Sequence, residues 1–388
     1  MSPIAKKEYT EVVSPRYRSS RKYLKTVILD HYCDATKYHR KHAITKLNNC
    51  HKKRYKRKPG RPSYYSQEPI IMPLRKIWKA AQMPCSKRLK AIIQEWLPFM
   101  DEEVPVYVKR ALLGISPATI DRVLRPYRTG RRRRMYCATK PGKIIKTKIP
   151  IKTDQWNENR PGFLEADTVV HCGGTLLGDF INTIDTVDIA TGWSEQRAIW
   201  GKSKHHVVEQ IKDIEQSLPF KLLGFDSDNG NEFLNKTLIK YFTRGPKNPV
   251  QFTRSRPYHK DDNAHIEQKN WTHVRQWFGY YRFDNPDILG LFNDLYKNEW
   301  RLYHNFFMPS MKLVAKDRVG SRIVKKHDKP QTPFRRLLTS RFVDAQMKMN
   351  LKHQYLALNP FFLRKEIDRK LKIIFEKRRP ASFKAFFQ

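Results

Sequence analysis

The order of strand-like and helix-like segments between residues 160 and 305 constrains the fold more than any other feature of the sequence. Strand patterns come first, at 163–170, 179–188 and 192–200, with glycine-containing turn signals between them. Helix and strand patterns then alternate, and these segments lie at 203–217, 222–225, 232–242, 250–253, 263–281 and 287–305. Consecutive strands followed by alternating helices and strands predict a mixed α/β sheet flanked by helices.

The net charge indicates the kind of partner. The chain carries 77 Lys and Arg against 37 Asp and Glu, a formal net charge of +40. Such an excess predicts a polyanionic partner, nucleic acid first and an anionic membrane surface second. No apolar run approaches the length of a membrane span, and residues 1–8 lack the apolar core of a secretory signal. We therefore expect no membrane localisation.

The five cysteines are scattered, odd in number and without a CxxC pair. This spacing is typical of neither a disulfide framework nor a zinc site, so we expect reduced thiols in a cytosolic protein. His39, His42 and His51 lie near Cys33 and Cys50, which leaves a zinc site open as an alternative. The irregular spacing favours incidental thiols.

Two N-terminal segments have the pattern of DNA-binding helices. Residues 15–50 have helical spacing, with Tyr23, Val27 and Ile28 on one face, and fit either a helix-turn-helix or a simple helical hairpin. The basic stretch 51–62 ends in Pro-Gly-Arg-Pro, which fits a minor-groove insertion or a flexible linker that contacts phosphates.

A second helical module is expected over 63–127. Gly114 suits a turn between helices, Ser116 can cap the next helix, and Pro117 fits its first position. Thr119 and Arg122 would face outward, as in a recognition helix. The residues expected to pack inward are Ile120, Val123 and Leu124. An ordinary helical hairpin is the alternative, which the basic flanks make less favourable.

The composition divides the rest of the chain. Residues 128–159 form a basic, proline-interrupted linker, in which we expect DNA contacts from Arg131, Arg132, Arg133 and Arg134. Residues 306–388 are basic and mostly helical, with helices near 351–358 and 365–375 and an extended stretch at 322–339. The predicted domains are 1–62, 63–127, 128–159, 160–305 and 306–388.

Three acidic residues stand out within the α/β segment. Asp167 lies inside a strand, where an aspartate is disfavoured and costly to bury. Asp228 follows the strand at 222–225, at the edge where α/β sheets build sites. Glu267 lies near the start of a helix and shares a face with Asn270. Each has an ordinary explanation alone, but together they supply the hard oxygen donors that Mg²⁺ or Mn²⁺ prefers.

The motifs around these acids resemble those of a known family. They are Asp167, then Asp-Ser-Asp-Asn-Gly-Asn-Glu-Phe at 226–233, Arg-Ser-Arg-Pro-Tyr at 254–258, and Asn-Ala-His-Ile-Glu-Gln-Lys-Asn at 263–270. Over about residues 160–305 the chain resembles the catalytic core of DDE transposases and retroviral-type integrases, especially bacterial insertion-sequence transposases. It departs from that family in Asn-Ala-His before Glu267, and in a slightly longer interval between Asp228 and Glu267.

The resemblance implies a ribonuclease H-like core and a metal-dependent polynucleotidyl transferase. Two Mg²⁺ or Mn²⁺ ions would be held by Asp167, Asp228 and Glu267. Such an enzyme cuts transposon ends and joins the freed 3′-OH to target DNA. Asn270 would orient Glu267 or touch DNA, and Glu165 would be secondary. The further candidate DNA contacts are Arg254, Arg256, Lys260 and Lys269.

Double-stranded DNA is thus the expected partner, and joining two ends in concert implies a homo-oligomer. The resemblance also implies a bacterial, nucleoid-associated location in the cytoplasm. A non-catalytic DNA-binding regulator is the alternative function, although a regulator would usually have lost one of the three acids. A ribonuclease H-type nuclease shares the sheet and the metal chemistry, but it has little use for duplex-reading helices.

Overall fold

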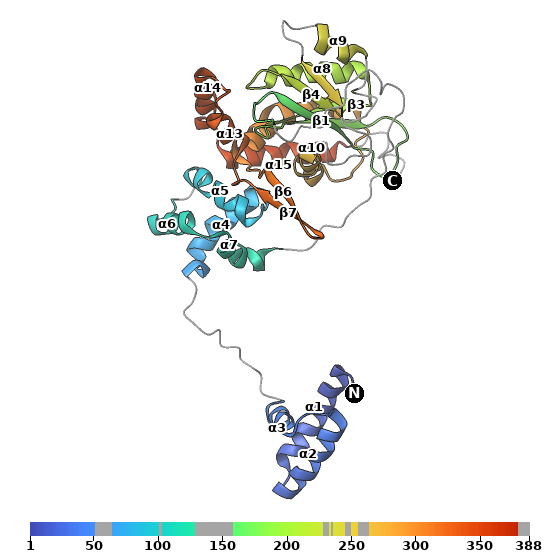
Figure 1. Cartoon of the computed structure of the whole chain (residues 1–388), viewed down its shortest axis with the longest axis vertical. Coiled ribbons are helices and arrows are strands. Elements are labelled where there is room, and N and C mark those ends of the chain that lie inside the picture. The colour runs from blue at the N-terminus through green and yellow to red at the C-terminus, as the bar shows by residue number, and fades with distance from the viewer. Residues whose placement is uncertain are drawn as a thin grey trace. The chain divides into compact units, whose positions relative to one another are not determined.

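The computed structural model describes residues 1–50, 64–100, 103–128, 158–227, 233, 236–244, 250–254 and 264–378. The chain divides into two compact units, Met1–Pro62 and Ser63–Gln388 (Figure 1). The basic stretch 51–62 and nearly all of the predicted linker at 128–159 lie outside the described residues. In the ranges described, no helix is both long and apolar enough to cross a bilayer.

The first unit is a bundle of three helices. They are α1 (Pro3–Ser19), α2 (Lys22–Thr36) and α3 (Arg40–Asn49). Leu29 and Tyr32 of α2 face the small core, and the Tyr32 hydroxyl shares a hydrogen bond of 2.6 Å with Thr10 of α1. The predicted helical spacing is present in α2. Tyr23 and Val27 are exposed, whereas Ile28 packs against this core.

The second unit opens with a helical region. Its helices are α4 (Glu68–Ala80), α5 (Ser86–Trp96), α6 (Val106–Gly114) and α7 (Pro117–Leu124). The predicted cap of α7 is confirmed, because the Ser116 side chain accepts from the Thr119 backbone N–H and Pro117 occupies the first position. Ile120 and Leu124 are buried as expected.

A five-stranded mixed sheet follows, which confirms the predicted α/β class. Its strands are β1 (Phe163–Val170), β2 (Ile181–Asp188), β3 (Ser194–Trp200), β4 (Gly224–Ser227) and β5 (Gln251–Arg254). The spatial order is β3-β2-β1-β4-β5, antiparallel through the first three strands and parallel from β1 to β5. The extent of β1 agrees with the prediction at both ends.

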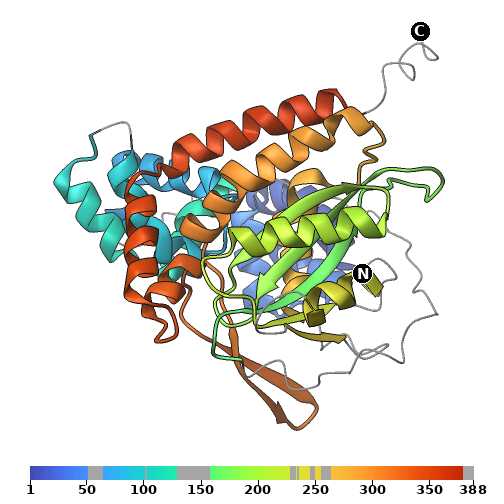
Figure 2. The same ribbon diagram turned by 90° about the horizontal axis from the view of Figure 1, so that it is seen from above.

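The two faces of the sheet differ in chemistry. One face presents apolar residues such as Leu164, Ile184 and Phe225 to α8 (Lys204–Ser217) and α9 (Lys236–Arg244), and Figure 2 shows α8 lying along the sheet. The other face lies under a helix that starts with α10 (Ala264–Lys269) and contacts β1 and β2. That helix continues through the π-helical turn η6 (Asn270–Arg275) into α11 (Gln276–Phe278).

A second long helical segment completes the core. It runs from η7 (Pro286–Ile288) through α12 (Leu289–Leu295) to the π-helical turns η8 (Tyr296–Trp300) and η9 (Tyr303–Phe307). Its aromatic residues share one hydrophobic cluster with α4–α7. The Tyr303 hydroxyl donates to the Ala80 carbonyl at 2.6 Å, and the Trp96 indole N–H to the Phe307 carbonyl at 3.4 Å. The helical region before the sheet thus packs on the sheet's own helices, and the predicted domain boundaries stay predictions.

The C-terminal region begins with the two-stranded hairpin β6 (Leu313–Val319) and β7 (Arg322–His327). It continues with α13 (Pro333–Thr339), α14 (Ala345–Leu356) and α15 (Pro360–Glu376). The two predicted helices are present, but the expected extended stretch at 322–339 is wrong over α13. The Thr332 side chain caps that helix, accepting from the Arg335 backbone N–H, and Pro333 occupies its first position.

Candidate active site

Asp167 lies in the centre of β1, on the face of the sheet that carries acidic residues. Directly paired residues on neighbouring strands point to the same face, and side chains two positions apart do so as well. Asp167 pairs with Asp185 of β2, and Glu165 pairs with Asp226 of β4. Glu165, Asp185 and Asp226 are buried, and Asp167 is half-buried. Carboxylates from neighbouring strands are thus concentrated on one face of a protein with a large positive charge.

The helix that carries Glu267 is attached to this face by hydrogen bonds to both acids of β1. At its start, the Ile266 backbone N–H donates to Oε2 of Glu165 at 3.1 Å. One turn later, Nδ2 of Asn270 donates to Oδ2 of Asp167 at 2.6 Å. The other oxygen of Asp167 accepts from the Thr168 backbone N–H at 2.7 Å. The first contact satisfies a helix N-terminal N–H, and the second fixes the orientation of the Asp167 carboxylate.

Glu267 itself is exposed at the surface of α10, between these two anchor points. Its position in the chain, one residue after Ile266 and three before Asn270, keeps it on the segment of helix that is attached to the acidic face of the sheet. The structure therefore brings Glu267 and Asp167 to one region, on an element held from two sides. No hydrogen bond from Asn270 to Glu267 is present among the described contacts, and the amide is directed to Asp167 instead.

The third predicted acid, Asp228, lies outside the described residues. The described part of β4 ends at Ser227, which pairs with Ala166 of β1. In the sequence, Ala166 and Ser227 are the residues immediately before Asp167 and Asp228.

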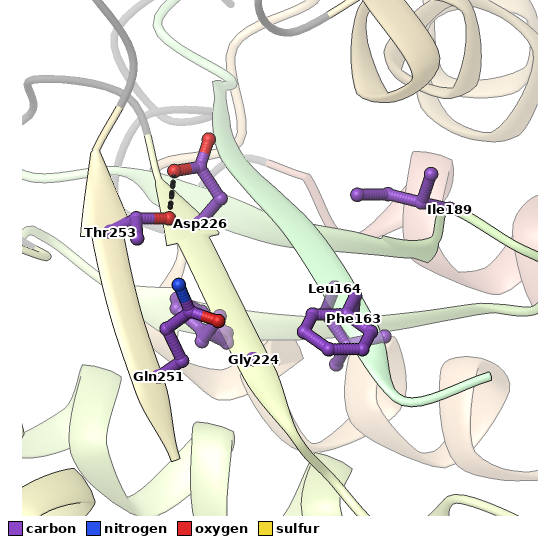
Figure 3. Close-up of a pocket in the computed structure, with 8 residues that line it drawn as sticks. Phe163, Leu164, Ile189, Gly224, Asp226, Gln251 and Thr253 are labelled. Carbon is purple, nitrogen blue, oxygen red and sulfur yellow. Dashed lines mark hydrogen bonds between the residues drawn. The ribbon is translucent and has the colours of Figure 1, made fainter. Parts of the chain in front are cut away.

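Asp226, expected in the loop, lies within β4 instead. Its Oδ1 accepts a hydrogen bond from the Thr253 hydroxyl of β5 (Figure 3). The side chain is buried, in a small crevice lined also by Phe163 and Gln251. This carboxylate is therefore a buried side chain of β4, which lies between the parallel strands β1 and β5. The short apolar run before it caused the error, because it made the strand seem to end at Phe225.

Two buried ionisable groups lie beside Asp167. Burial raises the pKa of Asp185 to about 7, and the nearby Asp167 carboxylate adds to that rise, while Gln196 Nε2 donates to Asp185 at 2.7 Å. Burial lowers the pKa of Lys269 to about 7, against the attraction of Asp185. The Lys269 ammonium lies 3.3 Å from Nε2 of His273. Burial disfavours the charged form of both groups, and the electrostatic attraction between Asp185 and Lys269 opposes that effect.

The sequence did not single out Asp185, although its place in an alternating strand beside Asp167 was a usable signal. Nor did it identify His273 of this helix and His304 of η9, whose stacked ring centroids lie 4.0 Å apart. Burial keeps the pKa of both histidines well below the usual range. They are core residues that support the Asn270 turn of the helix.

The candidate DNA contacts differ in exposure. Arg122 is exposed on α7, and its guanidinium donates to the half-buried Thr119 hydroxyl at 3.0 Å. Arg254 is only 8% exposed and Lys269 only 7%, so neither presents its cation as an open surface group. The remaining candidates lie outside the described residues: Arg131, Arg132, Arg133, Arg134, Arg256 and Lys260.

The described residues contribute two of the three predicted metal ligands. Within the ranges that the structure describes, no cluster of three or more His, Cys, Asp or Glu side chains is arranged to hold a metal ion. The donor chemistry nevertheless fits a hard divalent cation. Asp167 and Glu267 are carboxylates, and the acidic face of the sheet lies beneath them.

Comparison with known proteins gives one close relative in sequence. The chain is 34% identical over 348 residues to "Uncharacterized protein y4rM" of Sinorhizobium fredii (strain NBRC 101917 / NGR234), which covers 87% of this chain and 96% of that protein. The chain therefore belongs to the same family as this protein. No protein-family model matches the sequence.

Among solved structures, similarity is found to the catalytic core domain of BIV integrase. The identity is 14% and the TM-score 0.28, over 50% of this chain and 98% of that chain. A second similar structure is the simian T-cell lymphotropic virus intasome in complex with the PP2A regulatory subunit B56 gamma. There the identity is 14% and the TM-score 0.30, over 57% of this chain and 83% of that chain.

Proposed function

We propose that this protein is a DDE-type transposase, a metal-dependent polynucleotidyl transferase with a ribonuclease H-like core. The observation that carries the proposal is the hydrogen bond from Asn270 to Asp167, because it ties the helix bearing Glu267 to the strand bearing Asp167. Residues 103 positions apart in the chain are brought together at the acidic face. A chain of net charge +40 has little other reason to gather carboxylates there.

The strand register supports including Asp228 in the same site. Pairing of β1 with β4 runs from Phe163 and Gly224 to Ala166 and Ser227. The next residues in the two sequences are Asp167 and Asp228. We propose that Asp167, Asp228 and Glu267 together hold two Mg²⁺ or Mn²⁺ ions, the ions that carboxylate oxygens select.

The residues of this chain then have separate tasks. Asn270 and the Thr168 backbone N–H hold the Asp167 carboxylate in one orientation. Glu165 fixes the start of α10 and so the height of Glu267 above the sheet. The metal ions, when bound, would activate the attacking oxygen and stabilise the leaving 3′ oxygen. The metal ions would neutralise the carboxylates of the site, and the phosphate groups of DNA would neutralise the basic side chains around it.

The chemistry proceeds by two displacements at phosphorus, without a covalent protein intermediate. In the first, a water oxygen bonds to the phosphorus and the P–O3′ bond breaks, which leaves a 3′-OH and a 5′-phosphate. In the second, that 3′-OH attacks a target phosphodiester, and the target's own 3′ oxygen leaves. Each step forms one P–O bond and breaks another, so no further reactant is needed. We propose that the duplex is engaged by the basic modules that include Thr119 and Arg122, in the bacterial cytoplasm and as a homo-oligomer.

The test is cleavage of labelled duplexes that cover the DNA on both sides of the gene, with Mg²⁺ present. Asp167→Asn and Glu267→Gln should each abolish nicking and joining while DNA binding persists. Glu209→Gln is the matched control, since Glu209 is an exposed acid on α8, on the opposite face of the sheet. Binding without cleavage by the wild-type protein on these duplexes would favour the non-catalytic regulator.

A further inference from the structure

The β6–β7 hairpin is exposed on both faces. It projects from the body of its unit in both views (Figures 1 and 2). Every residue of β7 is exposed, including Ile323 at 56% and Val324 at 51%. On β6, Val314 and Val319 are 64% and 65% exposed. Apolar side chains are thus presented to solvent along both strands, where no other described part of the chain covers them.

Such a ribbon lacks the packing that usually stabilises a sheet. An isolated two-stranded hairpin is marginally stable in water. Exposed valines and isoleucine along both strands indicate a surface that is completed by a binding partner.

The base of the hairpin, in contrast, is firmly held. The Lys312 backbone N–H donates to Oδ1 of Asp328 at 2.6 Å, and Arg336 of α13 donates to Oδ2 of the same carboxylate at 2.9 Å. The Lys312 ammonium donates to the carbonyl of Ala190 in the β2–β3 turn at 2.8 Å. The strands therefore leave the body from a fixed stem, which sets the direction of the ribbon relative to the sheet.

The charge of the hairpin decides between possible partners. From Leu313 to His327 the only acid is Asp317, and the basic residues are Lys316, Arg318, Arg322, Lys325 and Lys326. A second copy of the chain would bring another net charge of +40 to this surface. A duplex brings phosphates, and its major groove is wide enough to admit a two-stranded β-ribbon.

We propose that the β6–β7 hairpin inserts into the major groove of duplex DNA. This inference rests on the proposed function, since it assigns a second contact to the same DNA substrate. The basic side chains meet the phosphates that border the groove, and the exposed valines and isoleucine meet thymine methyl groups and sugar edges inside it. A hollow of about 490 Å³ lies at the hairpin base, with Lys312, Asp328, Arg336 and Arg341 in its lining.

The test compares the salt dependence of duplex binding for two triple variants of the full chain. The hairpin variant is Arg322→Gln, Lys325→Gln, Lys326→Gln, which removes three exposed cations of β7. The control variant is Lys352→Gln, Lys365→Gln, Lys372→Gln, which removes three exposed cations of α14 and α15. Glutamine removes the positive charge and keeps a polar, flexible side chain. Hydrogen exchange of the 313–327 amides, with and without a duplex, gives a measurement that needs no variant.

The plot of log affinity against log salt concentration should become shallower by about 2.7 for the hairpin variant, if each of the three cations neutralises one phosphate. It should change by less than 1 for the control, and DNA should slow exchange of the hairpin amides. An equal change in both variants, or unprotected hairpin amides in a wild-type complex that still binds and cuts DNA, overturns the hairpin assignment alone. A wild-type protein that binds no duplex overturns both this inference and the proposed function. Loss of self-association in the hairpin variant, with an unchanged salt slope, would assign the surface to a second copy.

Discussion

The Asn270 side chain offers a sharp test of how the candidate site is held together. Its amide donates to Oδ2 of Asp167 at 2.6 Å, across the join between helix and sheet. Asn270→Ala removes this donor from Oδ2, while the Thr168 backbone N–H still donates to the other oxygen. The Asp167 carboxylate would then sample other orientations, and the site would lose its preorganised ligand geometry.

The size of the effect follows from the kind of bond. A hydrogen bond to an ionised acceptor contributes about 1.5–3 kcal/mol. If that contribution is realised in the transition state, the cleavage rate should fall by roughly 10-fold to roughly 150-fold, since about 1.36 kcal/mol corresponds to tenfold. Asn270→Asp should cost more, because it places a second negative charge beside Asp167.

The assay is single-turnover strand cleavage at saturating protein, with the dissociation constant of the duplex measured in parallel. Gln268→Ala is the control, as Gln268 is an exposed residue of the same helix. The prediction is a slower cleavage rate for the Asn270 variant with unchanged DNA affinity. A wild-type rate in Asn270→Ala, or a loss that appears only in DNA affinity, would refute the reasoning that this amide positions a catalytic carboxylate.

Three further predictions concern stability. Burial raises the pKa of Asp188 to about 6, so its stabilising contribution is present below its unfolded pKa near 3.9 and is lost as pH rises through 6; the free energy of unfolding of wild type minus that of Asp188→Asn should fall by about 2 kcal/mol between pH 4 and pH 7, and a constant difference would contradict this. Trp96→Ala should lower the free energy of unfolding by about 3–5 kcal/mol in urea denaturation, since Trp96, the last residue of α5, is fully buried against the helix that ends at Phe307; an effect below about 1 kcal/mol would show that α4–α7 are not part of that core. Glu165→Ala should cost about 1–3 kcal/mol by leaving the Ile266 N–H without its acceptor, whereas Glu165→Gln should retain most of the stability; equal losses in the two variants would argue against that contact.

The strands of the core were predictable because their alternation and turn residues carry a strong local signal. The segment 163–170 was located at both ends, and the Ser116 cap of α7 was recognised from Ser and Pro in adjacent positions. Tyr23 and Val27 have helical spacing and are nevertheless exposed, because an apolar pattern does not say which of two adjacent faces finds a partner. The helix α13 was missed because its start is set by a Thr-Pro cap after a genuine strand.

The residue types of the site were predictable, whereas the contacts that hold them in position were less so. Asp167 and Glu267 were found because an acid in a strand and an acid at a helix start stand out locally. The link from Asn270 to Asp167 depends on how α10 crosses the sheet, which is a tertiary property. Lys269 was predicted to touch DNA from its charge, yet its ammonium is buried and lies 3.3 Å from Nε2 of His273, four residues further along the same helix.

The most direct measurement asks whether Asp228 ligates the catalytic metal, by exchanging the oxygen ligand for sulfur. Asp228→Cys should be inactive in cleavage with Mg²⁺, a hard ion that binds thiolate poorly, and should regain activity with Mn²⁺, which accepts sulfur better. Asp228→Ala is the control and should stay inactive with both ions. Cleavage by Asp228→Cys with Mg²⁺ at the wild-type rate would contradict the account, because Asp228 would then not be a ligand of the metal that performs the reaction.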